Sequence, residues 1–220
     1  MESIYSHLRK EHHKVPCSQE THIDLCIEDY NKPGNARKFE ENARVMLYRA
    51  PMYCAKLLAE ILTDTLKNAK ILDVAAGPGQ VGSELYKVGF RNVHALDGSW
   101  AMLEACRQKK VYSDYLCCII EEYGAVPVDD GFYDAVVTSG AVLEHHLPAS
   151  SQSEFARITR PGGYCVISYS SDVTVTEYGK AWQAESKRLE ETDIWKVHCK
   201  VVIPDYYKNL SGFVDIFKVL

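Results

Sequence analysis

Apolar and polar positions follow two rhythms along the chain, and the change between them falls near Lys70. From Ala36 to about residue 62, apolar side chains recur at roughly helical spacing. Pro51 suits the first turn of a second helix in this region, because the amide that proline lacks is not needed there. Residues 1 to about 35 are polar and irregular, and we expect a loop or tail.

Beyond Lys70, short apolar runs alternate with amphipathic segments. The apolar runs predict strands at residues 70–76, 92–97, 115–120, 132–138, 164–169, 195–203 and 213–220. The segments between them predict helices at residues 80–88, 99–109, 154–159 and 176–190. Strands that are apolar along their whole length are typical of a parallel sheet covered on both faces. The pattern therefore predicts an α/β fold, with a three-layer, doubly wound, mostly parallel sheet.

Length and charge narrow the picture. A chain of 220 residues supports one hydrophobic core, so we expect one structural domain overall. Within it, residues 1–67 are expected to form a tail and helical cover, and residues 68–220 the α/β domain. The 25 basic and 30 acidic residues give a net charge of −5. A protein that grips phosphates should carry a basic surplus or stripe, so nucleic acid is an unlikely partner.

The sequence also bears on compartment and metals. No run of 18 apolar residues occurs, and the N-terminal segment is polar, so we expect neither a membrane span nor a signal peptide. A cytoplasmic location follows, with the nucleus as a second one. The eight cysteines show no CxxC pair and no zinc spacing with histidine. We therefore expect free thiols and no metal site.

Candidate chemistry begins at the turn after the first predicted strand. Residues 77–82, Gly-Pro-Gly-Gln-Val-Gly, match GxGxxG, which is formally a dinucleotide fingerprint. Glycine lets the backbone approach a ligand closely, and the following helix N-terminus offers free amides. In a doubly wound sheet, ligands bind outside the carboxyl ends of the strands. This motif alone leaves a dinucleotide and other nucleotide cofactors open.

Asp73 lies inside the first predicted strand. A carboxylate buried in a sheet is costly unless something pairs with it. The α-ammonium and sulfonium of S-adenosylmethionine would pair with Asp73, whereas the pyrophosphate of a dinucleotide would be repelled. The alternative is that Asp73 only braces neighbouring backbone amides.

Asp97 ends the second predicted strand, where a carboxylate can accept both hydroxyls of a ribose from either cofactor. The alternative is an Asx turn with Gly98. Ser99 is expected to cap the next helix. Met102, one turn further on, could cover an adenine face or fill the core.

The chain resembles the class I S-adenosylmethionine-dependent methyltransferases over roughly residues 68–170. Four stretches carry the resemblance: Ile71-Leu72-Asp73-Val74-Ala75-Ala76-Gly77-Pro78-Gly79, Ala95-Leu96-Asp97-Gly98-Ser99 with Met102-Leu103, Phe132-Tyr133-Asp134-Ala135-Val136-Val137, and Arg160-Pro161-Gly162-Gly163. More narrowly, the chain is similar to the methyltransferase-like proteins of the Williams–Beuren region, through Leu47-Tyr48-Arg49-Ala50-Pro51 and Gly140-Ala141.

The resemblance implies a seven-stranded sheet with an antiparallel edge, and helices before Lys70 that close over S-adenosyl-L-methionine. It implies that Tyr48 and Arg49 approach the methionine end of the cofactor. The full set of implied cofactor-binding residues is Tyr48, Arg49, Asp73, Ala75, Gly77, Gly79, Asp97, Gly98, Met102, Ile120, Glu121 and Ser139. Two positions depart from the family pattern. Ala75 replaces the first loop glycine, and Ile120-Glu121-Glu122 leaves open which residue meets the adenine amino group.

Methyl transfer is an in-line displacement, so the enzyme mainly aligns the acceptor with the methyl group. A general base is needed only if the acceptor arrives protonated. His145 and His146, just past the fourth predicted strand, are the candidate catalytic residues, because imidazole titrates near neutral pH. The alternative is that both histidines belong to a solvated loop.

Missing motifs narrow the acceptor. The chain lacks an Asn- or Asp-Pro-Pro-aromatic element after the fourth predicted strand and a Pro-Cys nucleophile. Enzymes that methylate adenine, glutamine or cytosine are therefore disfavoured. A small molecule or a protein side chain is the expected methyl acceptor. Two alternatives stay open: a catalytically silent S-adenosylmethionine-binding protein or partner subunit, and an NAD-dependent oxidoreductase.

Overall fold

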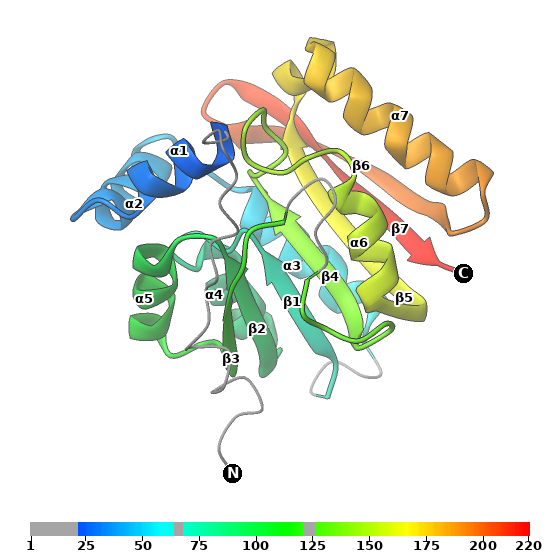
Figure 1. Ribbon diagram of the computed structural model, residues 1–220, viewed down its shortest axis with the longest axis horizontal. Coiled ribbons are helices and arrows are strands. Elements are labelled where there is room, and N and C mark those ends of the chain that lie inside the picture. Colours follow the sequence, from blue (N-terminus) through cyan, green and yellow to red (C-terminus); the bar gives the residue numbers. More distant parts are fainter. Residues whose placement is uncertain (1–21, 64–67, 121–125) are drawn as a thin grey trace.

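A single sheet runs through the computed structural model, which describes residues 22–63, 68–120 and 126–220 (Figure 1). Its order is β3-β2-β1-β4-β5-β7-β6. β7 runs antiparallel to β5 and β6, and the other neighbouring strands are parallel. The strands are β1 Lys70–Val74, β2 Asn92–Asp97, β3 Asp114–Cys117, β4 Tyr133–Ser139, β5 Thr159–Ser170, β6 Trp195–Tyr207 and β7 Leu210–Val219.

Helices cover both faces of the sheet (Figure 1). One buried cluster joins the sheet to α3, α4 and α5, and the other joins it to α6 and α7. The predicted three-layer, mostly parallel α/β fold with an antiparallel edge is therefore confirmed. The helices are α1 His22–Tyr30, α2 Asn35–Val45, α3 Ala50–Ile61, α4 Gln80–Val88, α5 Trp100–Lys109, α6 Ser151–Ile158 and α7 Glu177–Glu191, with a 3₁₀ turn at Ser171–Val175.

The strand order reverses between β1 and β4, which lie side by side with Asp73 opposite Val137 and Val74 opposite Thr138. β2 and β3 extend the sheet on one side of this pair, and β5 extends it on the other. The loops that leave β1 and β4 therefore diverge to opposite faces and open a crevice between them. This crevice at the carboxyl ends positions the candidate site.

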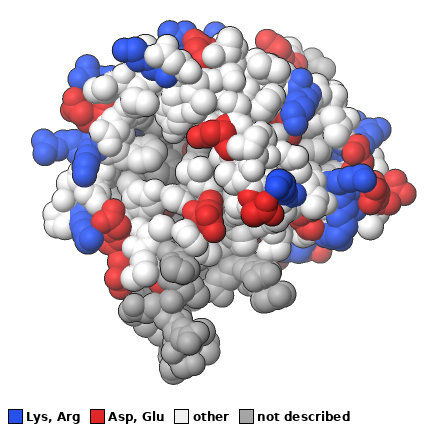
Figure 2. All heavy atoms as spheres, turned by 90° about the horizontal axis from the view of Figure 1, so that it is seen from above, with Lys and Arg blue, Asp and Glu red and all other residues white. Residues whose placement is uncertain are grey.

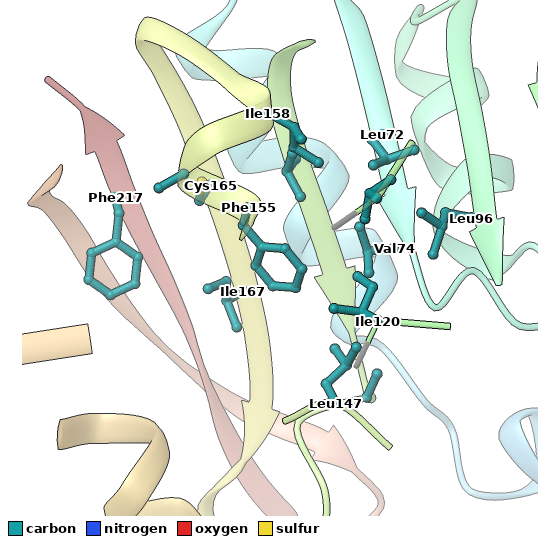
Figure 3. Packing of buried hydrophobic residues seen from close by; sticks show 14 of the residues in the cluster. Leu72, Val74, Leu96, Ile120, Leu147, Phe155, Ile158, Cys165, Ile167 and Phe217 are labelled. Carbon is teal, nitrogen blue, oxygen red and sulfur yellow. The ribbon is translucent and has the colours of Figure 1, made fainter. Parts of the chain in front are cut away.

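Buried apolar side chains hold the loops around the crevice in place. Figure 3 shows Ile120 and Leu147 beside Val74, at the end of the β1 packing layer. Ile120 follows β3 and is 4% exposed, and Leu147 follows β4 and is 5% exposed. Burying such a side chain stabilises the fold by roughly 1.5–3 kcal/mol. Ile120 and Leu147 therefore fix the two loops to the hydrophobic core.

The expectation of an irregular segment up to residue 35 was wrong for α1. Ile23, Cys26, Ile27 and Tyr30 recur at i, i+3, i+4 and i+7, which is one face of a helix. This four-residue pattern is short and lies among polar residues, so it is easily missed. Its apolar face has a partner only in the folded chain, where it covers the crevice.

Other boundaries differ by a few residues from the expected ones. β3 ends at Cys117 rather than at Ile120, because Ile120 turns inward to the core. β5 begins at Thr159 and runs through Pro161-Gly162-Gly163, where a turn was expected. Its pairing with β4 shifts register between Tyr133 and Ala135, so an irregular strand end accommodates the proline and glycines.

α3 is the N-terminal helix that packs directly on the core. α3 packs against α4 and β5, and its Ala50, Cys54 and Leu58 side chains are fully buried. Pro51 lies in the first turn of α3, as expected.

The division of the chain into a cover and an α/β domain at residue 67 stays a prediction. Among the helices of the described ranges, none combines the length and apolar character that a membrane span requires.

Candidate functional site

A cavity lies over the carboxyl ends of β1, β2 and β4, under α1 and α2. Its walls come from the loop after β1, the end of β2, the segment after β3 and the loop after β4. Figure 2 looks onto this end of the molecule, where the surface is hollowed within a largely uncharged (white) area. Among the described residues of its lining, Asp97 is the one carboxylate, and no Lys or Arg takes part.

Asp97 connects the first two strand ends. Its Oδ2 accepts a hydrogen bond from the Gly77 amide at 2.8 Å, and its Oδ1 accepts one from the Ser99 amide at 2.8 Å. Each carboxylate oxygen keeps a further lone pair, so Asp97 can still accept two hydroxyl donors from a ligand. Burial raises the pKa of Asp97 to about 6, against the lowering effect of the two amides. Both predictions for Asp97, the turn and the ligand contact, are compatible with this geometry.

Gly77 faces open space. Its φ is +54°, and a Cβ built on it would meet no atom within 4 Å. Because Gly77 lines the cavity, that open space is where a ligand can approach the backbone. A nucleotide cofactor that binds at a glycine-rich turn needs such open space beside the backbone.

Gly82, the third glycine of GxGxxG, has a different role. A Cβ there would lie 2.1 Å from Cζ of Tyr112, whose ring packs against the first turn of α4. The Gly82 amide donates to the Tyr112 hydroxyl at 3.0 Å. Gly82 therefore makes room for a side chain of this protein, and the match to a dinucleotide fingerprint is formal at this position.

Asp73 contacts the same tyrosine. The Tyr112 hydroxyl donates to Asp73 Oδ2 at 2.6 Å, while Asp73 Oδ1 is buried without a hydrogen-bond partner. Burial raises the pKa of Asp73 to about 7, and the hydrogen bond from Tyr112 opposes that shift. Asp73 is fully buried beneath the loop and does not reach the cavity lining, so its contact with a cofactor ammonium stays a prediction.

A second, smaller cavity adjoins the first at the start of α4. Tyr48 lines it, and the Tyr48 hydroxyl lies 2.6 Å from Ser139 Oγ at the end of β4. The Tyr48 ring stacks on the Tyr207 ring, with 4.9 Å between the ring centroids. This contact holds the segment before α3 against the end of β6. The Ser168 hydroxyl donates to Ser139 Oγ at 2.8 Å, so Ser139 has two hydroxyl partners.

Arg49 points elsewhere. Its guanidinium pairs with Asp205 of β6, and the Tyr53 hydroxyl donates to the same carboxylate. Arg49 lines neither cavity, and its predicted contact with the cofactor stays a prediction. The structure gives Arg49 a role in holding the start of α3 against β6.

The loop after β4 brings His145 and His146 to the cavity. His146 Nδ1 lies 3.1 Å from the carbonyl oxygen of Glu144, and a carbonyl can only accept, so Nδ1 carries the hydrogen. In the neutral imidazole, His146 Nε2 then accepts from the Tyr30 hydroxyl at 2.8 Å. The pair joins α1 to the loop after β4. A catalytic role for either histidine stays a prediction.

Further contacts hold α1 over the cavity. Asn31 Oδ1 accepts from the Ser99 hydroxyl at 2.8 Å, and a Cβ on Gly98 would lie 2.6 Å from Ile27 Cδ1. With α1 in this position the cavity volume is about 100 Å³. Small-molecule sites usually have about 300 Å³ or more, so in this position α1 encloses the cavity closely.

Comparison with known proteins agrees with this geometry. Residues 72–167 match the family described as "Methyltransferase domain". The chain is 31% identical to human methyltransferase-like protein 27 over 161 residues, which is 73% of this chain and 65% of the relative. It is 31% identical to the malonyl-[acyl-carrier protein] O-methyltransferase of Yersinia pestis over 63% of this chain and 51% of that protein. The chain thus spans about half to two thirds of the length of these relatives.

Solved structures show the same fold. The magnesium protoporphyrin IX methyltransferase of Synechocystis PCC 6803, solved with bound S-adenosylmethionine, superimposes with a TM-score of 0.67 at 13% identity, over 91% of this chain and 99% of that one. A TehB-like S-adenosylmethionine-dependent methyltransferase from Corynebacterium glutamicum superimposes with a TM-score of 0.58 at 16% identity, over 86% of this chain and 100% of that one. Residues 72–167 thus match the methyltransferase domain family, and the fold is that of the class I methyltransferases. The resemblance inferred from the sequence is confirmed at this level.

Most of the predicted cofactor-binding residues gather at the two cavities. Gly79 and Asp73 support the loop from outside the cavity linings, Arg49 lies apart, and Glu121 falls outside the described residues. The predicted residues that line one or both cavities are Tyr48, Ala75, Gly77, Asp97, Gly98, Met102, Ile120, Ser139, His145 and His146.

The sequence did not single out the lining residues that α1 and α2 contribute, among them Ile23, Ile27, Tyr30 and Phe39. The first three form the apolar face of α1, and their i, i+4, i+7 spacing could have revealed that face. Phe39 was counted only as an apolar position of a helix. Among the described residues, no group of three His, Cys, Asp or Glu side chains could hold a metal ion.

Replacing Ala75 with glycine should stabilise the protein by about 0.5–1 kcal/mol. Ala75 has φ +53°, a left-handed conformation that costs an alanine roughly 1–2 kcal/mol and costs glycine little. Part of the gain is lost because glycine is more flexible when unfolded. Urea unfolding measures the change. Ala76→Gly is the matched control, because Ala76 has no positive φ, and it should destabilise. Equal losses in both variants would contradict strain at Ala75.

The pH dependence of stability should flatten in Asp73→Asn. Asp73 titrates near 7 when folded and near 3.8 when unfolded, so the folded protein keeps a proton that the unfolded chain has released. The wild type should therefore lose stability as the pH rises from about 4 through about 7. Without Asp73, that decline should shrink by on the order of 3 kcal/mol.

Urea unfolding at pH 5, 6, 7 and 8 measures this slope. Asp193→Asn, which changes an exposed carboxylate, is the control and should leave the slope as it is. Asp97 contributes to the same decline with a pKa of about 6, so some slope should remain in Asp73→Asn. An unchanged slope in that variant would show that Asp73 is already ionised in the folded protein at pH 5.

Proposed function

We propose that the protein is a methyltransferase that binds S-adenosyl-L-methionine and transfers its methyl group to a small-molecule or protein acceptor. The observation that carries the proposal is Asp97, which holds the Gly77 amide, lines the cavity and keeps acceptor capacity for a ribose. The open space at Gly77 supports close approach of the same ligand. The relatives named above are methyltransferases, two of which act on different acceptors by name.

In this proposal the adenosine end lies along β2 and the segment after β3. Asp97 accepts the ribose hydroxyls, while Met102 and Ile120 enclose the adenine. The amino-acid tail lies in the second cavity, where the first turn of α4 favours its carboxylate. Asp73, with one oxygen unpaired beneath the loop, is the proposed partner of the ammonium group.

The cofactor supplies an activated methyl group. The protein's own residues align the acceptor and exclude water, because α1 and α2 close over the cavity. His146 is the proposed proton acceptor, with Nδ1 held by Glu144 and Nε2 available once an acceptor hydroxyl or amine replaces Tyr30. The absence of Lys and Arg from the described lining favours an acceptor without negative charge at the reacting atom.

Calorimetry with S-adenosylhomocysteine and, separately, NAD tests the cofactor assignment. We expect binding of S-adenosylhomocysteine and none of NAD. The reverse result would replace the methyltransferase with an oxidoreductase.

A second assay tests transfer. The protein is incubated with S-adenosylmethionine labelled in its methyl group and with a cell extract, and we expect a labelled product. Binding without any labelled product would favour a silent binder or partner subunit. The expected cytoplasmic compartment stays a prediction that localisation microscopy can test.

A further inference from the structure

The two cavities share four lining residues: Phe39, Ala75, Gly77 and Ser139. In the proposed function, the adenosine end occupies the first cavity and the amino-acid tail occupies the second. Sulfur is the atom that joins these two parts of S-adenosylmethionine. The shared residues therefore mark where the sulfonium lies, and this placement rests on the proposed function.

A positive charge at that junction has few partners. Asp97 is the one carboxylate among the described residues that line either cavity, and it lines only the first, at the ribose end. Ser139 Oγ already has the hydroxyls of Tyr48 and Ser168 as partners, at 2.6 and 2.8 Å. Ala75 and Gly77 offer no polar side chain. Phe39 is the remaining shared residue, and its ring is only partly buried.

We propose that Phe39 binds the sulfonium through its aromatic face and makes the site prefer the charged methyl donor over the neutral product. A ring attracts a cation through its quadrupole, more strongly where water is excluded. Transfer of the methyl group leaves a neutral thioether, so this attraction is lost when the product forms. Phe39 lies on α2, one of the two helices that cover the cavity. The same helix would therefore contribute to the preference for the charged form of the cofactor.

The test compares three ligands by calorimetry: S-adenosylmethionine, S-adenosylhomocysteine and sinefungin, which carries an ammonium near the position of the sulfonium. Phe39→Leu removes the ring and keeps an apolar side chain. It should weaken binding of the two cationic ligands by about 2- to 30-fold, and leave S-adenosylhomocysteine within about twofold. Phe39→Tyr keeps a ring and should retain the wild-type preference.

Tyr30→Leu is the matched control, because Tyr30 lines the first cavity but not the second. It should change the three affinities by one common factor. Thermal unfolding of each variant verifies that it folds.

Equal weakening of all three ligands by Phe39→Leu, or no change in any, would overturn the proposal while leaving cofactor binding intact. If the wild type binds none of the three ligands, the proposed function fails first, and the role of Phe39 fails with it.

Discussion

Valine at position 77 should abolish binding of S-adenosylhomocysteine while leaving the fold intact. A side chain on Gly77 points into open space within the cavity, so it meets the ligand rather than the protein. Its methyl groups would occupy the place where the cofactor approaches the backbone. We expect the affinity to fall by more than about 100-fold, close to 3 kcal/mol, as measured by calorimetry.

The valine also carries a conformational cost, because φ at Gly77 is +54°. Gly34→Val separates this cost from the loss of binding. Gly34 has φ +84°, and a Cβ there likewise meets nothing within 4 Å, but Gly34 precedes α2 and lines neither cavity. Both variants should lose some stability in urea, and only Gly77→Val should lose the ligand. Normal binding by Gly77→Val would move the cofactor away from this turn.

Asp97→Ala should lower both ligand affinity and stability. Loss of charge-assisted hydrogen bonds to the ribose should weaken S-adenosylhomocysteine by roughly 1–3 kcal/mol. The amides of Gly77 and Ser99 also lose their acceptors, which should lower the free energy of unfolding by about 1–3 kcal/mol. Calorimetry and urea unfolding measure the two effects separately.

Asp114→Ala is the control for removing a carboxylate. Asp114 begins β3, at the opposite end of the sheet, and its Oδ1 accepts only from the neighbouring Tyr115 amide among the hydrogen bonds described. This variant should bind S-adenosylhomocysteine as the wild type does. Unchanged affinity in Asp97→Ala would remove Asp97 from the binding site and leave it a purely structural turn residue.

Local chemistry explains why much of the site could be predicted. Ser99 caps α5 by accepting from the Met102 amide at 3.2 Å, as its position before an apolar run indicated. Gly77 lies after a buried strand, where a parallel sheet places ligands, and the cavity is there. These predictions depend on neighbours within a few residues and on a rule of sheet topology.

Contacts between distant segments account for the predictions that were wrong or incomplete. Asp73 and Gly82 both owe their surroundings to Tyr112, some thirty or more residues further along the chain. α1 was missed because its apolar face is short and its partners, Gly98 and His146, lie on other loops. Neither the Tyr112 contacts nor the contacts of α1 with Gly98 and His146 can be read from neighbouring positions in the sequence.

The sequence by itself determined the α/β class, the parallel core of the sheet, and the turn that offers glycine to a ligand, while the antiparallel edge followed from the family resemblance. Burial of apolar strands and the special backbone freedom of glycine are local properties, and they are readable residue by residue. Only the tertiary structure decided which carboxylate faces the cavity, that a tyrosine fills the space beside Gly82, and that Phe39 stands between the two cavities. Those outcomes depend on which distant side chains the fold brings within contact distance.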